Sequence, residues 1–288
     1  MSLPSNVHLS SHPCLQAKLS LIRSSSTTPR ETRGLVHDLA NILGVEAFSG
    51  LKVVKTGTDT TPLGIEYETQ GIDPADLALV PILRSGLGMV DVRTYPIQNT
   101  PDTIPFCMYS LSPSITISLH PTHSLALFPP TPNPWTQNPA YTTPALNDLL
   151  PTPVPVYHLG LFREKVSLQP VEYYNNLPFH RSELSLASPA SLNPTTNTAA
   201  ASLAVLLDPV IATGATAEAA IQLLRDWGVK KVIMLSLLAS EEGVKRAAGT
   251  WSEVEVWVGG IDKGVDEKGM IVPGIGDIGD RLFVAIGK

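Results

Sequence analysis

Four short, nearly continuous apolar runs constrain the fold of this 288-residue chain most strongly. They span Leu77–Leu83, Leu203–Leu207, Lys231–Leu238 and Val254–Val258. Runs of this kind are typical of strands that are buried on both faces, as in a parallel sheet. Helical patterns over 216–227 and 241–248 separate the last three runs. The alternation predicts βαβ units and an α/β fold, with an open, mostly parallel sheet flanked by helices.

The amino-terminal region is expected to be helical. Apolar residues recur at helical spacing from Pro13 to Ile22, which predicts a first helix. The segment Thr28-Pro29-Arg30-Glu31 combines an N-cap hydroxyl, a proline in the first turn and a capping-box glutamate. A second helix is therefore expected to begin at Thr28 and to end at Gly44 or Gly50. Short extended segments are expected after it, around 51–55 and 63–68.

Two stretches interrupt the alternation of strands and helices. Residues 93–155 hold 14 of the 26 prolines of the chain, a density that excludes regular helix and central strand. Residues 181–201 are rich in Ser, Thr, Asn and Ala. Loops of this length are unusual inside a compact domain. We therefore expect a single domain over 1–288 that carries two insertions.

Composition limits the class of function. The net charge of −6 and the pI near 5.6 disfavour a general nucleic-acid or membrane-surface binder, because either needs a cationic face. Cys14 and Cys107 lie far apart, which disfavours a disulfide framework and structural zinc. No secretory signal is evident, and no run of about 18 apolar residues occurs. We expect a soluble cytoplasmic protein that binds neither nucleic acid nor membrane.

The segment after the second apolar run carries the strongest chemical signal. It reads Asp208-Pro209-Val210-Ile211-Ala212-Thr213-Gly214-Ala215-Thr216, an acid at the end of a strand followed by a hydroxyl-rich turn and a helix. Backbone N–H groups and hydroxyls around a helix N-terminus form a phosphate cradle. An ordinary strand–turn–helix capped by Thr216 would show the same local pattern. Neither Gly-Lys-Ser/Thr nor Gly-x-Gly-x-x-Gly occurs in it, which excludes a P-loop and a dinucleotide fingerprint.

This segment resembles the phosphoribosyl-pyrophosphate (PRPP) motif of type I phosphoribosyltransferases. Many members of that class have two adjacent acids, and Pro209 at the second position resembles the uracil-specific family. Val80–Asp91 is similar to the pyrophosphate loop of that family, with Arg84 as a forked cation. The resemblance implies a phosphoribosyltransferase domain of α/β fold.

A further segment resembles the β-arm hairpin of the uracil family, which is expected over about 156–178. It consists of His158–Glu164 followed by Gln169–Tyr174. By this resemblance Arg163 is a second arginine that is directed at the ligand. Without the resemblance, a solvent-exposed arginine on a hairpin is the simpler interpretation.

The glycine-rich segment Gly269–Arg281 is the most distinctive resemblance to the uracil family. Four glycines in eleven residues require a loop whose backbone a ligand can approach closely. By resemblance, this segment forms a small base-binding hood in which Ile271, Gly276 and Ile278 contact uracil through their backbone. Asp277 is implied to lie near the ribose or the pyrophosphate.

The resemblance implies that uracil reacts with PRPP to give UMP and pyrophosphate, with catalysis by positioning and electrostatic stabilisation. Mg²⁺ is the implied cofactor, held by PRPP without a direct protein ligand, and reached through water by Asp208 or Asp277. Arg84, Arg163 and Asp208 are the implied catalytic residues: the arginines clamp the pyrophosphate, and Asp208 holds the ribose hydroxyls. The implied PRPP-binding residues are Arg84, Arg163, Asp208, Pro209, Val210, Ile211, Ala212, Thr213, Gly214, Ala215, Thr216 and Asp277, and the implied uracil-binding residues are Ile271, Gly276, Asp277 and Ile278.

Four features depart from the usual pattern of the uracil family: Ala215, Met270, Ile278 and Ser240–Gly243. A positive φ at Ala215 would add strain of about 1 kcal/mol or more. Two alternatives stay open: a paralogous phosphoribosyltransferase for another pyrimidine-like base or for uracil breakdown, and a catalytically inactive regulatory relative. The resemblance also implies a homodimer or higher homo-oligomer, and it leaves open a GTP or other nucleotide effector.

Overall fold

The computed structural model describes residues 3–90, 93–95, 141–143, 146–164, 169–178 and 201–284. The chain forms two compact units, one from Met1–Val92 with Pro144–Lys288 and the other from Arg93–Thr143. In the second unit, β5 (Arg93–Tyr95) pairs antiparallel with β6 (Tyr141–Thr143). The other helices and strands belong to the first unit.

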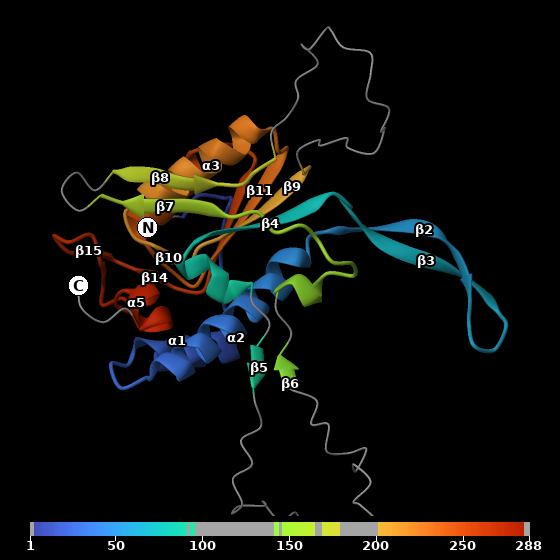
Figure 1. The fold of residues 1–288 in the computed structure, drawn as a ribbon, viewed down its shortest axis with the longest axis horizontal. Helices are drawn as coiled ribbons and strands as arrows, with labels where there is room; N and C mark the ends of the chain where they lie inside the picture. The colour runs from blue at the N-terminus through green and yellow to red at the C-terminus, as the bar shows by residue number, and fades with distance from the viewer. Residues whose placement is uncertain are drawn as a thin grey trace, which may run out of the picture. The chain divides into compact units, whose positions relative to one another are not determined.

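The first unit is built on a seven-stranded sheet (Figure 1). In spatial order the strands are β1 (Val7–Leu9), β13 (Val254–Val258), β11 (Lys231–Ser236), β9 (Leu203–Leu207), β4 (Leu77–Leu83), β7 (Leu159–Arg163) and β8 (Pro170–Asn175). Neighbouring strands run parallel, except that β7 and β8 form an antiparallel hairpin at one edge. The four apolar runs supply four adjacent strands of this sheet, and the predicted open α/β fold is confirmed.

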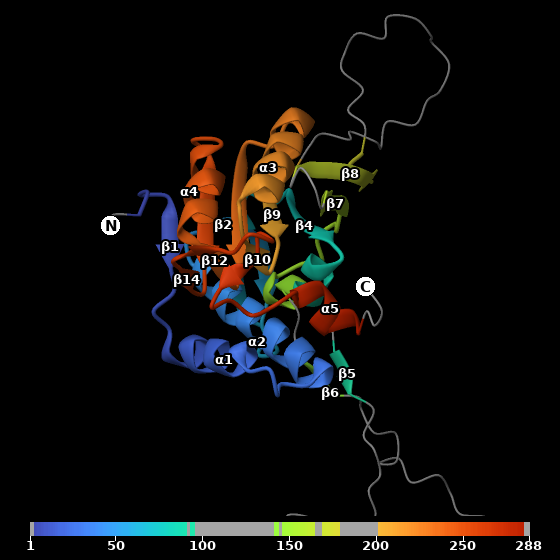
Figure 2. The ribbon, with the colours of Figure 1, turned by 90° about the vertical axis from the view of Figure 1, so that its left-hand side faces the viewer.

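Helices cover both faces of the sheet (Figure 2). Side chains of β9 alternate between two hydrophobic clusters, because successive residues of a strand point to opposite faces. Leu203, Val205 and Leu207 pack on one face, whereas Ala204 and Leu206 pack on the other. The first face carries α1 (Pro13–Arg23), α2 (Pro29–Phe48), α5 (Ile278–Phe283) and the short 3-10 helices η1 (Ser85–Met89) and η2 (Leu146–Leu149), and the second face carries α3 (Ala215–Trp227) and α4 (Glu241–Gly249).

The capping box predicted at the start of α2 is present. The Thr28 hydroxyl accepts the Glu31 N–H at 3.3 Å, and the Glu31 carboxylate accepts the Thr28 N–H at 2.8 Å. The helix runs through Gly44 and ends at Phe48, so neither glycine ends it. Gly44 serves close packing instead, because a Cβ at this position would collide with the side chain of Leu146 in η2.

The strand expected over Lys231–Leu238 is interrupted, which corrects the prediction. The chain leaves the main sheet after Ser236 and continues as β12 (Leu238–Ser240). The N–H groups of Leu237 and Leu238 both donate to the Pro209 carbonyl, at 3.0 and 3.1 Å. Beyond this point the two segments pair again in the same register, because Val210 lies opposite Leu238 as Leu207 lies opposite Leu235. A second parallel sheet therefore forms beyond the break, from β10 (Val210–Ile211), β12 and β14 (Ile261–Asp262).

Two hairpins complete the first unit. The extended segments expected near 51–55 and 63–68 are longer than predicted, and they form β2 (Lys52–Thr60) and β3 (Glu66–Asp73), a hairpin that projects from the body (Figure 1). The other hairpin, β15 (Gly264–Val265) with β16 (Ile271–Val272), leads into α5. Most of the insertions predicted at 93–155 and 181–201 lies outside the described residues. No described helix is long and apolar enough to span a bilayer.

Candidate active site

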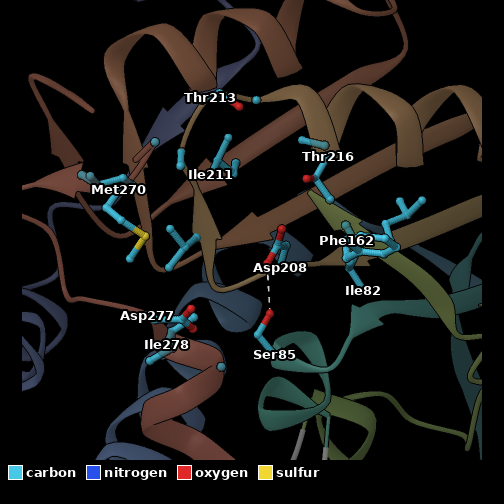
Figure 3. Close-up of a pocket in the computed structure, with 18 of the residues that line it drawn as sticks. Ile82, Ser85, Phe162, Asp208, Ile211, Thr213, Thr216, Met270, Asp277 and Ile278 are labelled. Atoms are coloured by element: carbon cyan, nitrogen blue, oxygen red, sulfur yellow. Dashed lines mark hydrogen bonds between the residues drawn. The ribbon is translucent and has the colours of Figure 1, made fainter. Parts of the chain in front are cut away.

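A cleft of about 1050 Å³ opens at the carboxyl ends of β4 and β9 (Figure 3). Open α/β sheets bind their ligands at this edge. The cleft is lined by the end of β4 with the start of η1, by residues 208–217, by the hairpin of β7 and β8, and by residues 267–279. These segments are far apart in the sequence, and the sheet brings them together.

The cleft collects most of the residues predicted for the site. Pro209 and Ala215 are buried and do not line it. Arg163 ends β7, and its side chain lies outside the described residues. The predicted residues that line the cleft are Arg84, Asp208, Val210, Ile211, Ala212, Thr213, Gly214, Thr216, Ile271, Gly276, Asp277 and Ile278.

Asp208 follows β9 directly and lies in the wall of the cleft with 8% of its surface exposed. The Ser85 hydroxyl donates to Oδ1 of Asp208 at 3.4 Å (Figure 3). Burial raises the pKa of the Asp208 carboxyl to about 7, although hydrogen bonds from the Val210 N–H and from Ser85 act in the opposite direction. A cation or hydroxyl donors of a ligand would lower this pKa and favour the carboxylate.

The phosphate loop, residues 212–216, joins β10 to α3. Gly214 is the N-cap of α3 and adopts a φ of 76°. Ala215 is the first helical residue, and the described part of the chain contains one non-glycine residue of positive φ, Val284. The strain considered for Ala215 is therefore absent, because the left-handed conformation falls on Gly214, one position earlier. A Cβ on Gly214 would also lie only 2.7 Å from the Gly243 carbonyl oxygen.

The phosphate loop rests on the first turn of α4. The buried Ser240 hydroxyl donates to the Ala212 carbonyl at 2.5 Å and accepts the Gly243 N–H at 2.8 Å. Gly243 packs so closely against Ala212 that a Cβ would collide with the Ala212 carbonyl. The departure at Ser240–Gly243 thus supplies a hydroxyl and a glycine that support the loop.

The opposite wall of the cleft begins at the end of β4. The peptide bond between Leu83 and Arg84 is cis. The Arg84 side chain is exposed, and its Cζ lies 5.9 Å from the ring centroid of Phe283 in α5. Gly86 lies against the Leu207 carbonyl, where no side chain fits. The loop after β4 is therefore held close to the end of β9, and Arg84 can reach into the cleft.

The carboxyl-terminal wall is a glycine-rich turn that leads into α5. Gly276 has a φ of 71° and is exposed to the cleft, so a ligand can approach its backbone. The buried Ile278 side chain adjoins it. Asp277 is the N-cap of α5, and its Oδ1 accepts the Asp280 N–H at 3.0 Å. Asp277 thus has a structural partner as well as a place on the cleft.

Several residues that line the cleft were not predicted from the sequence. Ser85 lies inside the loop after β4 and contacts Asp208. Phe162 and Tyr173 come from β7 and β8, with ring centroids 6.0 Å apart. Met270 points toward the cleft between Ile211 and Ile278 (Figure 3). Ser85 and Met270 could have been predicted, because each lies in a sequence motif next to predicted site residues. The placement of the Phe162 and Tyr173 rings depends on the pairing of β7 with β8, which no local pattern specifies.

The acidic groups of the cleft suit a hard cation that arrives with its ligand. In the part of the chain that the structure describes, no three His, Cys, Asp or Glu side chains gather into a metal site. The described residues that line the cleft include four carboxylates, Asp208 and Asp277 with Glu164 and Glu267. Mg²⁺ commonly binds through one or two carboxylates together with water and substrate phosphates, so this donor set fits it.

Comparisons with known proteins agree with this geometry. The sequence matches the uracil phosphoribosyltransferase family over residues 9–101 and 142–285. The Schizosaccharomyces pombe protein urg2 is 31% identical over 281 residues, which cover 98% of this chain and 91% of the relative. A uracil phosphoribosyltransferase of Roseiflexus castenholzii is 32% identical over 277 residues, which cover 96% of this chain and 97% of the relative.

Similarity of fold extends to a solved structure. The AQ2163 protein of Aquifex aeolicus superposes with a TM-score of 0.66 at 23% identity, over 97% of this chain and 98% of that chain. At this identity the similarity establishes the fold alone. The family match and the curated relatives go further, and they show that this chain belongs to the uracil phosphoribosyltransferase family.

Proposed function

We propose that this chain transfers the phosphoribosyl group of PRPP to uracil, giving UMP and pyrophosphate in pyrimidine salvage. Membership in the family supports this chemistry. One observation carries the proposal: the phosphate loop and the glycine-rich turn before α5 line the same cleft, with Asp208 on its wall. A ligand with a phosphate at one end and a nucleobase at the other fits this arrangement.

The phosphate loop suits the 5′-phosphate of PRPP. It leads into the N-terminus of α3, where unpaired backbone N–H groups and the helix dipole attract an anion. The hydroxyls of Thr213 and Thr216 add donors at the same place. Such a site binds phosphate with few cationic side chains, which agrees with the low charge of the chain.

The transfer step breaks the bond between the anomeric carbon and a pyrophosphate oxygen as a bond to N1 of uracil forms, and the N1 proton leaves to water or to the departing pyrophosphate. In our proposal, Asp208 holds the ribose hydroxyls and stabilises the positive charge that develops on the sugar ring. Arg84 and Arg163 bind the departing pyrophosphate through charge-assisted hydrogen bonds. Mg²⁺, when bound, neutralises negative charge on the pyrophosphate oxygens.

Uracil is proposed to bind against the turn before α5. Its amide edge presents donors and acceptors that match the backbone groups of Ile271, Gly276 and Ile278. The positive φ of Gly276 and its exposure to the cleft support this role, because glycine itself places no side chain between its peptide and a ligand. Met270 and Val210 supply apolar surface for the flat face of the base.

Initial rates with PRPP, Mg²⁺ and a panel of bases test the proposal directly. We expect turnover with uracil, measured as pyrophosphate release, and much lower rates with cytosine, thymine and orotate. A preference for another base would instead indicate a paralogous phosphoribosyltransferase that acts on that base. No turnover, with PRPP binding retained in calorimetry, would indicate the inactive regulatory relative instead.

Two variants connect the activity to this cleft. Asp208→Asn and Arg84→Ala are expected to reduce kcat/KM strongly, and near-native rates in both would contradict the proposed roles. Asp59→Asn is a matched control, because Asp59 is exposed on β2 and lies outside the cleft. It should leave the rate unchanged.

A homodimer or higher homo-oligomer is part of the proposal. The hairpin of β2 and β3 supports it, because Leu63 is 85% exposed and Ile65 is 61% exposed on that hairpin. A two-stranded hairpin of this kind is only marginally stable alone. Stimulation by GTP or another nucleotide and a cytoplasmic location stay predictions, and rates measured with and without GTP test the former.

A further inference from the structure

An ion pair outside the cleft holds the turn that precedes α5. Arg23 ends α1 and Asp262 ends β14. The guanidinium binds the carboxylate in a bidentate manner, with both N–O distances at 2.8 Å. The same two side chains grip one residue of the turn: Arg23 donates to the Gly274 carbonyl at 2.9 Å, and Asp262 accepts the Gly274 N–H at 2.9 Å. Neither Arg23 nor Asp262 lines the cleft.

Gly274 is the point at which the chain turns toward the cleft. Its φ is 64°, and a Cβ there would collide with the carbonyl of Ile271. Gly276, two residues later, is exposed to the cleft. The direction of the segment 276–278 therefore depends on how the Gly274 backbone is oriented. The ion pair fixes that orientation, because it binds both the carbonyl and the N–H group of Gly274.

A second arginine strengthens the same connection. Arg281 in α5 donates to the Ile275 carbonyl at 2.8 Å. It also donates to the Ile22 carbonyl at 2.5 Å and to the Ser24 carbonyl at 3.0 Å. These two carbonyls lie at the carboxyl end of α1, where a cation is favourable. Two arginines thus join the end of α1 to residues 274 and 275.

The ion pair is partly withdrawn from water, so its geometry is well defined. Asp262 is 8% exposed, and the Arg23 side chain is 29% exposed. Burial raises the pKa of the Asp262 carboxyl, but the hydrogen bonds from Arg23 and Gly274 and the Arg23 charge outweigh it, and the pKa lies below its ordinary value. Removal of either partner leaves the charge of the other partly buried and without its counter-charge, which disturbs the turn at Gly274.

We propose that Arg23 and Asp262 are positioning residues for the base half of the site, and that they set the affinity for the base without changing the affinity for PRPP. This inference rests on the proposed function. The separation of the two halves follows from their supports. Ser240 and Asp262 are paired neighbours on β12 and β14, but their side chains hold different segments. The Ser240 hydroxyl binds the Ala212 carbonyl of the phosphate loop, whereas the Asp262 carboxylate and Arg23 bind Gly274 in the turn before α5.

The two partners are tested separately by conservative variants. Asp262→Asn keeps the shape and loses the charge, and Arg23→Lys keeps the charge and loses the bidentate geometry. We expect each to raise the KM for uracil between about 10-fold and about 100-fold, because misplacement of a binding group has effects of this size. The KM for PRPP should stay within about twofold. Equal increases in both KM values, or an unchanged KM for uracil, would overturn the proposal.

Lys18→Gln is the matched control. Lys18 lies on the same helix and pairs with Asp38 of α2 at 2.8 Å, away from the turn and the cleft. This variant removes an α1 ion pair without touching Gly274. It should leave both KM values unchanged, and an increase in the KM for uracil equal to that of Arg23→Lys would show a general effect of α1 packing.

Hydrogen exchange of the ligand-free protein gives a readout that needs no substrate. In both variants the amide of Gly274 and its neighbours over 271–278 should exchange faster, because the Gly274 N–H loses a charged acceptor or its orientation. Exchange over 208–216 should not change. If the wild-type protein fails to use uracil while the two variants show this exchange pattern, the proposed function alone is refuted. If exchange over 271–278 in the variants equals that of the wild type, the positioning role alone is refuted.

Discussion

The Ser240 hydroxyl donates to the Ala212 carbonyl at 2.5 Å, which joins the first turn of α4 to the phosphate loop. The same hydroxyl caps α4 by accepting the Gly243 N–H. One buried oxygen therefore satisfies a carbonyl of the loop and an N–H group of the helix. This bond and the close packing of Gly243 connect the loop to α4, and the pairing of β10 with β12 holds the segment just before it.

Substitution of Ser240 by alanine should weaken PRPP binding. The change leaves the Ala212 carbonyl and the Gly243 N–H without their partner, at a stability cost of about 1–2 kcal/mol. We expect the KM for PRPP to rise about 10-fold, while the KM for uracil changes much less. Initial rates and thermal melting measure the two effects. Ser252→Ala, which removes an exposed hydroxyl before β13, should change neither.

The raised pKa of Asp208 predicts how the stability of the ligand-free protein depends on pH. Below about pH 4 the carboxyl is protonated in both the folded and the unfolded states. Between about pH 4 and the folded pKa of about 7, the unfolded state ionises while the folded state stays protonated, so this group lowers the free energy of unfolding as the pH rises. The loss amounts to about 4 kcal/mol and is complete above that range.

Asp208→Asn removes this titration and isolates its contribution. The difference in free energy of unfolding between the variant and the wild type should grow in favour of the variant from pH 4 to pH 8. Urea unfolding at several pH values, in the presence of a chelator, measures it. A difference that stays constant across this range would show that the carboxyl titrates normally in the folded state.

Variants of Arg84 and Phe283 are expected to weaken pyrophosphate binding to different degrees. Arg84→Ala should reduce kcat/KM between about 10-fold and about 100-fold, the range expected when a charged hydrogen bond is lost. Arg84→Lys should restore little of this, since the planar fork is lost. Phe283→Leu removes the ring beside the guanidinium and should give a smaller loss. Inhibition by pyrophosphate should weaken in the same order, and equal inhibition of all three variants would contradict the assignment.

The hairpin of β2 and β3 predicts the behaviour of the oligomer. Leu63 and Ile65 lie near its tip, and polar substitutions there remove little packing within one chain. The double variant Leu63→Ser with Ile65→Ser should shift the mass measured by light scattering toward that of the monomer. Its thermal melting should stay cooperative, which shows that the single chain remains folded. Leu21→Ser on α1 changes a residue that is 59% exposed and serves as the control. An unchanged mass in the hairpin variant would exclude the tip from the interface.

Local sequence signals determined the elements and most of the cleft. The capping box at Thr28 and Glu31 marks the start of α2, and the apolar runs mark four strands, because hydrophobic pattern and capping act between near neighbours. Asp208 and the turn after it were recognisable for the same reason. They occupy one continuous segment that the end of a strand presents to the cleft.

Tertiary structure decided how these pieces are held. The break after Ser236 depends on the Pro209 carbonyl of the neighbouring strand, and the support of the phosphate loop depends on Ser240. Gly274 is gripped by Arg23 and Asp262, which no local pattern connects to it. Hydrogen bonds between residues this far apart in the sequence require the strand order of the folded sheet. The sequence by itself therefore determined many of the residues that line the cleft, whereas packing across the sheet brought Phe162 and Tyr173 there and decided what fixes the site.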